Sequence, residues 1–148
     1  MRRLIRNLVL VAGSMLLVAV LGLPVSAAPA FQPLKIVKEC SKYSGDIGSF
    51  CTVTESSLAA LPVGTTVFYY GPVTNNPLYN STSVVLEAGV GNTAIGYCIL
   101  DDQSVGLCAF SAGTGTLAGF QALLKVSVAD AKQMTYRWDG GYLLGAAK

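Results

Sequence analysis

The chain offers few side chains that commonly carry out catalysis. It contains no histidine, which removes the usual general base of serine and cysteine triads and the commonest nitrogen ligand for metals. We take Glu55, Tyr97 and Tyr69 as candidate ligand-binding residues and assign no residue a catalytic role. These three belong to a larger set of polar groups that could point into the interior of the fold: Glu55, Tyr69 or Tyr70, Glu87, Tyr97 and Arg137.

Two of these candidates have a competing interpretation. Glu55 ends the alternating segment FCTVTE, and if it points inward, burial would raise the pKa of its carboxyl and make it a proton donor. Because acids are rarely buried, the alternative is a solvated acid at the end of a strand. Tyr97 could orient a ligand through its hydroxyl, or fill the core with that hydroxyl bonded to the backbone.

The four cysteines indicate disulfides, since an even number is typical of exported chains. Three pairings are open. We predict Cys40 with Cys51 and Cys98 with Cys108, because each pair brackets a turn-like segment. A zinc site is excluded on spacing, because the chain has no C-x-x-C motif and no histidine. We expect no metal and no cofactor.

A β-hairpin is predicted between Cys98 and Cys108, where short polar residues favour a turn. If the cysteines face each other, this register also pairs Tyr97 with Ala109. The opposite face is apolar, whereas the cysteine face includes two glycines, so we expect the apolar face to point inward and the disulfide to lie on the outside. The apolar face consists of Ile95, Tyr97, Ile99, Leu107 and Ala109.

A corner and a long strand follow the hairpin. Gly113 and Gly115 can reach φ > 0 without a Cβ clash, which predicts a sharp corner between strands. From Thr116 to Val128, apolar and polar residues alternate with a period of two. This period predicts one half-buried strand in which Leu123 is the exception.

No segment shows convincing helical periodicity, and turn-rich segments punctuate the chain. This spacing of short strands favours an all-β fold, either an up-and-down barrel or a sandwich. Eight strands are predicted, at residues 34–40, 49–55, 65–70, 84–88, 92–100, 105–111, 116–128 and 134–143.

Three segments of this chain occur in a distinctive order: GNTAIGYCILD, LCAFSAGTGTLAGFQALLKVS and YRWDGGYLL, with LPVGTTVFYYGPV and STSVVLEAGV upstream. Together they resemble the allene oxide cyclase and dirigent-like barrel superfamily, and most closely its small secreted bacterial members of unassigned activity. The resemblance covers roughly residues 48–144. It implies a single antiparallel eight-stranded barrel of calycin-like type. Barrels of this superfamily can carry an acidic group in the region of Glu55.

The N-terminus predicts export. Three arginines precede an apolar run from Leu8 to Leu23 and a stretch of small residues, which indicates a signal peptide cleaved after Val25-Ser26-Ala27. The run is shorter than the ~20 residues that span a bilayer. We predict a signal peptide over 1–27, a loose leader over 28–33 and one barrel domain over 34–148. The mature protein is expected to be secreted, extracellular or periplasmic, without membrane attachment.

Removal of the signal changes the charge. The whole chain has ten basic and eight acidic residues, but three arginines lie in the signal, so seven basic and eight acidic residues remain, a net charge of −1. A nearly neutral domain does not favour binding to nucleic acid or to an anionic membrane surface.

Two classes of function stay open. The first is a non-catalytic barrel that binds a small apolar molecule or acts through its surface. The second is a cyclase-like or dirigent-like isomerase that guides a reactive intermediate inside the barrel. We favour the first, because the catalytic residues of allene oxide cyclases and the Asp, Arg and Tyr set of dirigent proteins do not map onto this chain. A cavity lined by Glu55 and Tyr97 would favour binding or catalysis, and a filled interior would favour neither.

Overall fold

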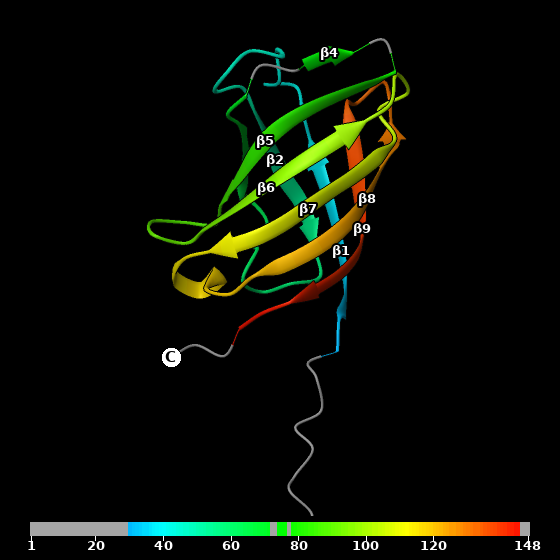
Figure 1. Cartoon of the computed structure of the whole chain (residues 1–148). Helices are drawn as coiled ribbons and strands as arrows, with labels where there is room; N and C mark the ends of the chain where they lie inside the picture. Colours follow the sequence, from blue (N-terminus) through cyan, green and yellow to red (C-terminus); the bar gives the residue numbers. More distant parts are fainter. Residues whose placement is uncertain (1–29, 72–73, 77, 146–148) are drawn as a thin grey trace, which may run out of the picture.

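The computed structural model describes residues 30–71, 74–76 and 78–145 (Figure 1). The predicted signal peptide lies outside the described residues. Of the predicted leader, residues 32 and 33 already belong to the first strand. In chain order the elements are β1 (Gln32–Glu39), β2 (Phe50–Ser56), β3 (Thr66–Tyr69), β4 (Thr74–Asn76), β5 (Tyr79–Glu87), β6 (Thr93–Leu100), β7 (Gly106–Gly113), the 3-10 helix η1 (Gly115–Leu117), β8 (Gln121–Asp130) and β9 (Thr135–Leu143).

The strands form one antiparallel sheet that closes on itself. Their order is β3-β2-β1-β9-β8-β7-β6-β5-β4, and β3 also pairs with β5. This pairing closes eight strands into a barrel, while the short β4 extends the sheet beyond β5 (Figure 1). The predicted all-β, antiparallel, eight-stranded barrel is confirmed. β4 was not predicted, and β5 begins five residues before the predicted strand at 84.

The predicted cysteine pairing and hairpin register are both confirmed. Disulfides join Cys40 to Cys51 and Cys98 to Cys108. On β6 and β7, Cys98 lies opposite Cys108 and Tyr97 opposite Ala109. The predicted facing of this hairpin, however, is wrong. The Cys98–Cys108 disulfide is buried inside the barrel, and Tyr97 is 47% exposed on the outer surface.

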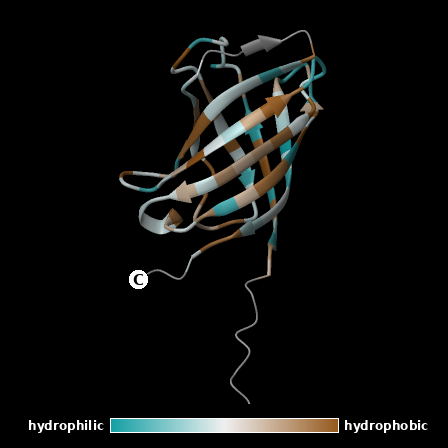
Figure 2. Ribbon diagram, viewed as in Figure 1, coloured by the Kyte–Doolittle hydropathy of each residue, from teal (hydrophilic) through white to brown (hydrophobic). Residues whose placement is uncertain are grey.

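The interior of the barrel is too narrow for large side chains from every strand. This limit explains why the cysteine face of the β6–β7 hairpin points inward and the apolar face points outward. Gly96 lies opposite Phe110, and a Cβ at Gly96 would stand 2.5 Å from Cδ1 of the Phe110 ring. Small residues on the inner face of β6 therefore make room for the ring from β7. The larger apolar side chains on this side of the barrel point outward, and the ribbon colours of Figure 2 mark hydrophobic residues along β5 to β8. Those exposed on this side include Ile95, Tyr97, Ile99, Leu107 and Leu123.

The glycine corner is present, but its form differs from the prediction. Gly115 has φ +56, and η1 begins there. Gly113 ends β7, where a Cβ would stand 2.0 Å from the backbone oxygen of Leu117. The helical turn occupies the first part of the predicted strand, so β8 begins only at Gln121. From there the predicted alternation holds, with Ala122, Leu124 and Val126 buried.

The two ends of the barrel are filled differently. Packing is tight at the end that contains η1, where Leu61, Leu86, Leu117 and Phe120 are fully buried. Phe110 links this layer to the middle of the barrel, with ring centroids 5.9 Å from Phe120 and 5.7 Å from Trp138. The opposite end, where β1, β3, β6 and β8 finish, contains a cavity.

Candidate ligand-binding cavity

The cavity has a volume of about 80 Å³ and a predominantly apolar and aromatic lining. It opens toward the end of the barrel near the β1–β2 loop, which contributes Tyr43, and the β6–β7 turn, which contributes Ser104. The lining residues are Lys38, Cys40, Tyr43, Tyr69, Asn80, Ser81, Thr82, Cys98, Leu100, Ser104, Cys108, Val126, Tyr136 and Trp138.

Lys38 is the one charged residue of that lining. It lies on β1 between Val37 and Glu39, and only 4% of its surface is exposed. Leu34 and Ile36 are fully buried on the same strand, and because side chains alternate along a strand, Lys38 follows them into the interior.

The Lys38 ammonium is surrounded by soft and aromatic groups. Its Nζ lies 4.7 Å from the ring centroid of Trp138, 5.1 Å from that of Tyr69 and 5.3 Å from that of Tyr136. These ring faces attract a cation by cation–π interaction. Burial of the amine nevertheless disfavours its charged form and lowers the pKa of Lys38 to about 7. Near neutral pH, the amine is therefore divided between charged and neutral forms.

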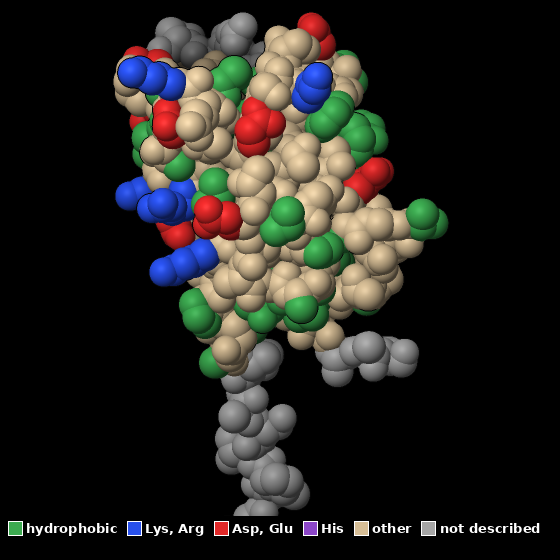
Figure 3. All heavy atoms as spheres, turned by 180° about the vertical axis from the view of Figure 1, so that it is seen from behind, with side chains coloured by type: hydrophobic (Ala, Val, Ile, Leu, Met, Phe, Trp, Pro, Cys, Tyr) green, Lys and Arg blue, Asp and Glu red, His purple; other side chains and the backbone are tan. Residues whose placement is uncertain are grey.

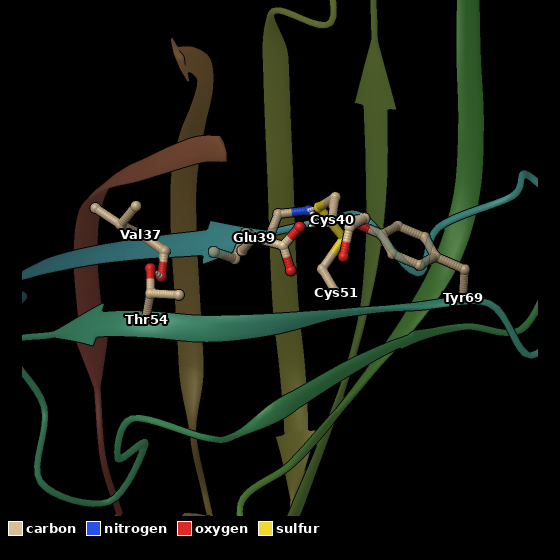
Figure 4. The surroundings of a disulfide bond; sticks show 8 residues. Val37, Glu39, Cys40, Cys51, Thr54 and Tyr69 are labelled. Atoms are coloured by element: carbon tan, nitrogen blue, oxygen red, sulfur yellow. Dashed lines mark hydrogen bonds between the residues drawn. A yellow bond between two sulfur atoms is a disulfide. The ribbon is translucent and has the colours of Figure 1, made fainter. Parts of the chain in front are cut away.

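Tyr69 and the Cys40–Cys51 disulfide complete the surroundings of the amine. Lys38 Nζ donates a hydrogen bond to the Tyr69 hydroxyl and contacts Cys51 Sγ at 3.5 Å and Cys40 Sγ at 3.6 Å. Figure 4 shows the ring of Tyr69 directed toward this disulfide, and its hydroxyl lies 3.4 Å from Cys51 Sγ. Burial, followed by the neighbouring Tyr43 and Tyr136, raises the pKa of the Tyr69 hydroxyl. Tyr69 therefore stays a neutral hydrogen-bonding group.

Trp138 provides a second donor beside the cavity. The side chain is fully buried, and its Nε1 is the only buried side-chain nitrogen or oxygen among the described residues that lacks a hydrogen-bond partner. A buried donor without an acceptor costs free energy. No carboxylate is part of the cavity lining, so the lining offers neither the Lys38 amine nor the Trp138 N–H an acidic acceptor.

The structure separates the three candidate residues predicted from the sequence. Tyr69 lines the cavity, as an inward-facing candidate should. Tyr97 points outward, and Glu55 is exposed on the outer surface beside Arg137, in a shallow groove over β1, β2 and β9. In the rear view of Figure 3, most lysine and arginine side chains lie on the left, and acidic side chains appear on both sides. The expected meeting of Glu55 and Tyr97 inside the barrel therefore does not occur.

Sequence reasoning missed Lys38, although the sequence contained a signal for it. In the segment LKIVKEC, Leu34, Ile36, Lys38 and Cys40 share one parity. Applying the two-residue period to β1 would have placed Lys38 on the buried face with Cys40.

No protein-family model, curated protein or solved structure matches the chain. The described residues hold no cluster of three or more potential metal-ligating side chains. They also contain no helix with the length and apolar character required to cross a bilayer.

Proposed function

We propose that the barrel binds a small, largely apolar molecule, whose hydrogen-bond-accepting end enters the cavity beside Lys38. The observation that carries this proposal is the buried amine, which is enclosed by aromatic rings and has no carboxylate partner in the cavity lining. An apolar pocket with a few convergent polar groups is typical of small-molecule sites. The aromatic walls suit the apolar part of the ligand, and Lys38 and Trp138 supply donors to its acceptor.

The size of the cavity limits what can enter. A volume of about 80 Å³ is roughly half that of an engineered cavity of ~150 Å³ that binds benzene. The enclosed part of the ligand is therefore about three or four non-hydrogen atoms, and any longer remainder must extend past Tyr43 and Ser104 at the opening.

We also propose that the protein is exported and that it belongs to the allene oxide cyclase and dirigent-like superfamily. Export is supported by the two disulfides and by the signal-like N-terminus. The family assignment is supported by the closed eight-stranded barrel and by the glycine corner that precedes β8. We favour binding over isomerase chemistry, because Glu55 is on the outer surface.

Native mass spectrometry of the disulfide-bonded protein, incubated with fractions of a metabolite extract, tests the binding proposal. A ligand should be retained by the wild type and lost in Val126→Phe and Leu100→Phe, which fill the cavity from β8 and β6. Ala109→Leu is the matched control, because Ala109 is exposed on the outer face of β7. Equal retention by the filled variants, or no retained mass in the wild type, would overturn the proposal.

A further inference from the structure

The Lys38 amine is arranged for a reaction as well as for hydrogen bonding. An amine attacks a carbonyl carbon only in its neutral form, and desolvation in an apolar pocket is a common way to activate lysine. The side chain lies on the cavity wall, with no carboxylate in the lining to hold it as a permanent ion pair. A molecule that enters the cavity therefore meets a lysine with a substantial neutral fraction.

We propose that Lys38 forms a reversible imine with a small apolar aldehyde or ketone bound in the cavity. This inference rests on the proposed binding function and names its ligand class. Nζ attacks the carbonyl carbon to give a carbinolamine, the N–C bond becomes a C=N bond, and the carbonyl oxygen leaves as water with the two protons that the amine gives up. The step is a condensation and needs no oxidant or reductant.

The neighbours of Lys38 fit each stage of this condensation. The Tyr69 hydroxyl is hydrogen-bonded to Nζ, so it can pass its proton to the departing oxygen while it takes one from the amine, and it remains neutral after the transfer. A protonated imine keeps the positive charge of the ammonium, so the faces of Trp138, Tyr69 and Tyr136 stabilise it as they do the amine. Trp138 Nε1–H is an additional donor beside the cavity.

The other described lysines provide an internal comparison. Lys35, Lys42, Lys125 and Lys132 are all exposed. Desolvation in an apolar pocket activates a lysine, and an amine that remains in water gains no such activation. Even after allowance for the lower nucleophilicity of a weaker base, Lys38 should react at least about tenfold faster than any of these four.

The test uses butanal with sodium cyanoborohydride at pH 7, which reduces imines and leaves the disulfides intact. Peptide mapping should locate the first added butyl group on Lys38. Lys38→Met should lose this rapid labelling, whereas Lys35→Met, an exposed site on the same strand, should retain it. Tyr69→Phe should slow labelling about tenfold or more if its hydroxyl acts as the proton donor.

Thermal melting with butanal and with butan-1-ol, both without reductant, separates failure of this inference from failure of the binding proposal. Stabilisation by either compound, together with labelling confined to exposed lysines, would overturn the imine and leave binding in place. Absence of both stabilisation and Lys38 labelling would count against both proposals. Rapid Lys38 labelling in the wild type that is absent from Val126→Phe would support both, and this result does not depend on how well Lys38→Met folds.

Discussion

At the scale of single residues, Lys38 is a buried amine whose removal from water affects the stability of the barrel. Moving an amine out of water disfavours its charged form, and the three aromatic faces and one hydroxyl offset this cost only in part. A methionine of similar shape would pack against the same rings without any charge to desolvate. We therefore expect the lysine to reduce stability relative to methionine, and strongly perturbed pKa values of this kind cluster at functional sites.

Because burial disfavours the charged form of Lys38, the free energy of unfolding should depend on pH. Below pH 7, Lys38 is charged in both the folded and the unfolded chain, and the full penalty is present. Between about pH 7 and 10, the unfolded chain still binds the proton, whereas the folded protein has released it. The free energy of unfolding should therefore rise with pH across this interval, by about 2 to 3 kcal/mol between pH 7 and 9.5.

Urea unfolding at several pH values checks this expectation. Lys38→Met should remove the rise and be at least as stable as the wild type at pH 6, whereas Lys35→Met should keep the rise. Measurements should stop near pH 9.5, because the raised pKa of Tyr69 makes stability fall again once tyrosines in the unfolded chain ionise. An unchanged rise in Lys38→Met would show that Lys38 is not its source.

At the scale of secondary-structure elements, spacing predicted the strands and the register better than it predicted facing. The turn between Cys98 and Cys108 determined which residues lie opposite one another, and the structure agrees. Apolarity then failed to identify the inner face, because β6 has large apolar residues outside and small ones inside. Which face of β6 points inward depends on the interior space that side chains from other strands already occupy, here the ring of Phe110. The sequence of β6 alone does not reveal how much of that space is occupied. Similarly, nothing in the period-two alternation after Thr116 indicated the short helix η1.

The corner before β8 provides a prediction at this scale. Gly115 needs a positive φ, and a Cβ there would stand 2.2 Å from Oδ1 of Asn92, which accepts a hydrogen bond from the Thr116 N–H. Gly91 also has a positive φ, of +76, but its Cβ would meet nothing within 4 Å. Gly91→Ala should therefore cost about 1 kcal/mol from backbone conformation alone, and Gly115→Ala about 1 to 2 kcal/mol more. Denaturant midpoints of the two variants measure the difference, and equal losses would contradict the clash with Asn92.

At the scale of the whole molecule, the barrel combines a filled end with an end that retains a cavity. Phe110, Phe120 and Trp138 fill the interior from η1 to the middle, while both disulfides lie toward the cavity end. The sequence predicted the cysteine pairs and the number of barrel strands, because both follow from local spacing. It could not predict the cavity, whose lining comes from strands that lie far apart in the chain. Lys38, Tyr69 and Trp138 come from β1, β3 and β9.

The positions of the disulfides predict how the protein responds to reducing agents. All four cysteines are 1–2% exposed, and dithiothreitol is larger than the enclosed part of the cavity that Cys40, Cys98 and Cys108 line. Dithiothreitol should therefore reach the sulfur atoms only when the barrel opens. Reduction of the folded protein by dithiothreitol should therefore be slow, and its rate should rise steeply with urea concentration as the open population grows. Trapping free thiols with iodoacetamide and counting added mass over time measures this rate.

Two variants test whether opening of the barrel limits reduction. Phe120→Ala removes a fully buried ring far from both disulfides and should cost about 3 to 5 kcal/mol of stability, so it should accelerate reduction. Leu123→Ala, at an exposed site on β8, should leave the rate of reduction unchanged. Rapid reduction in the absence of urea, equal in both variants, would mean that the sulfur atoms are reached without opening of the barrel.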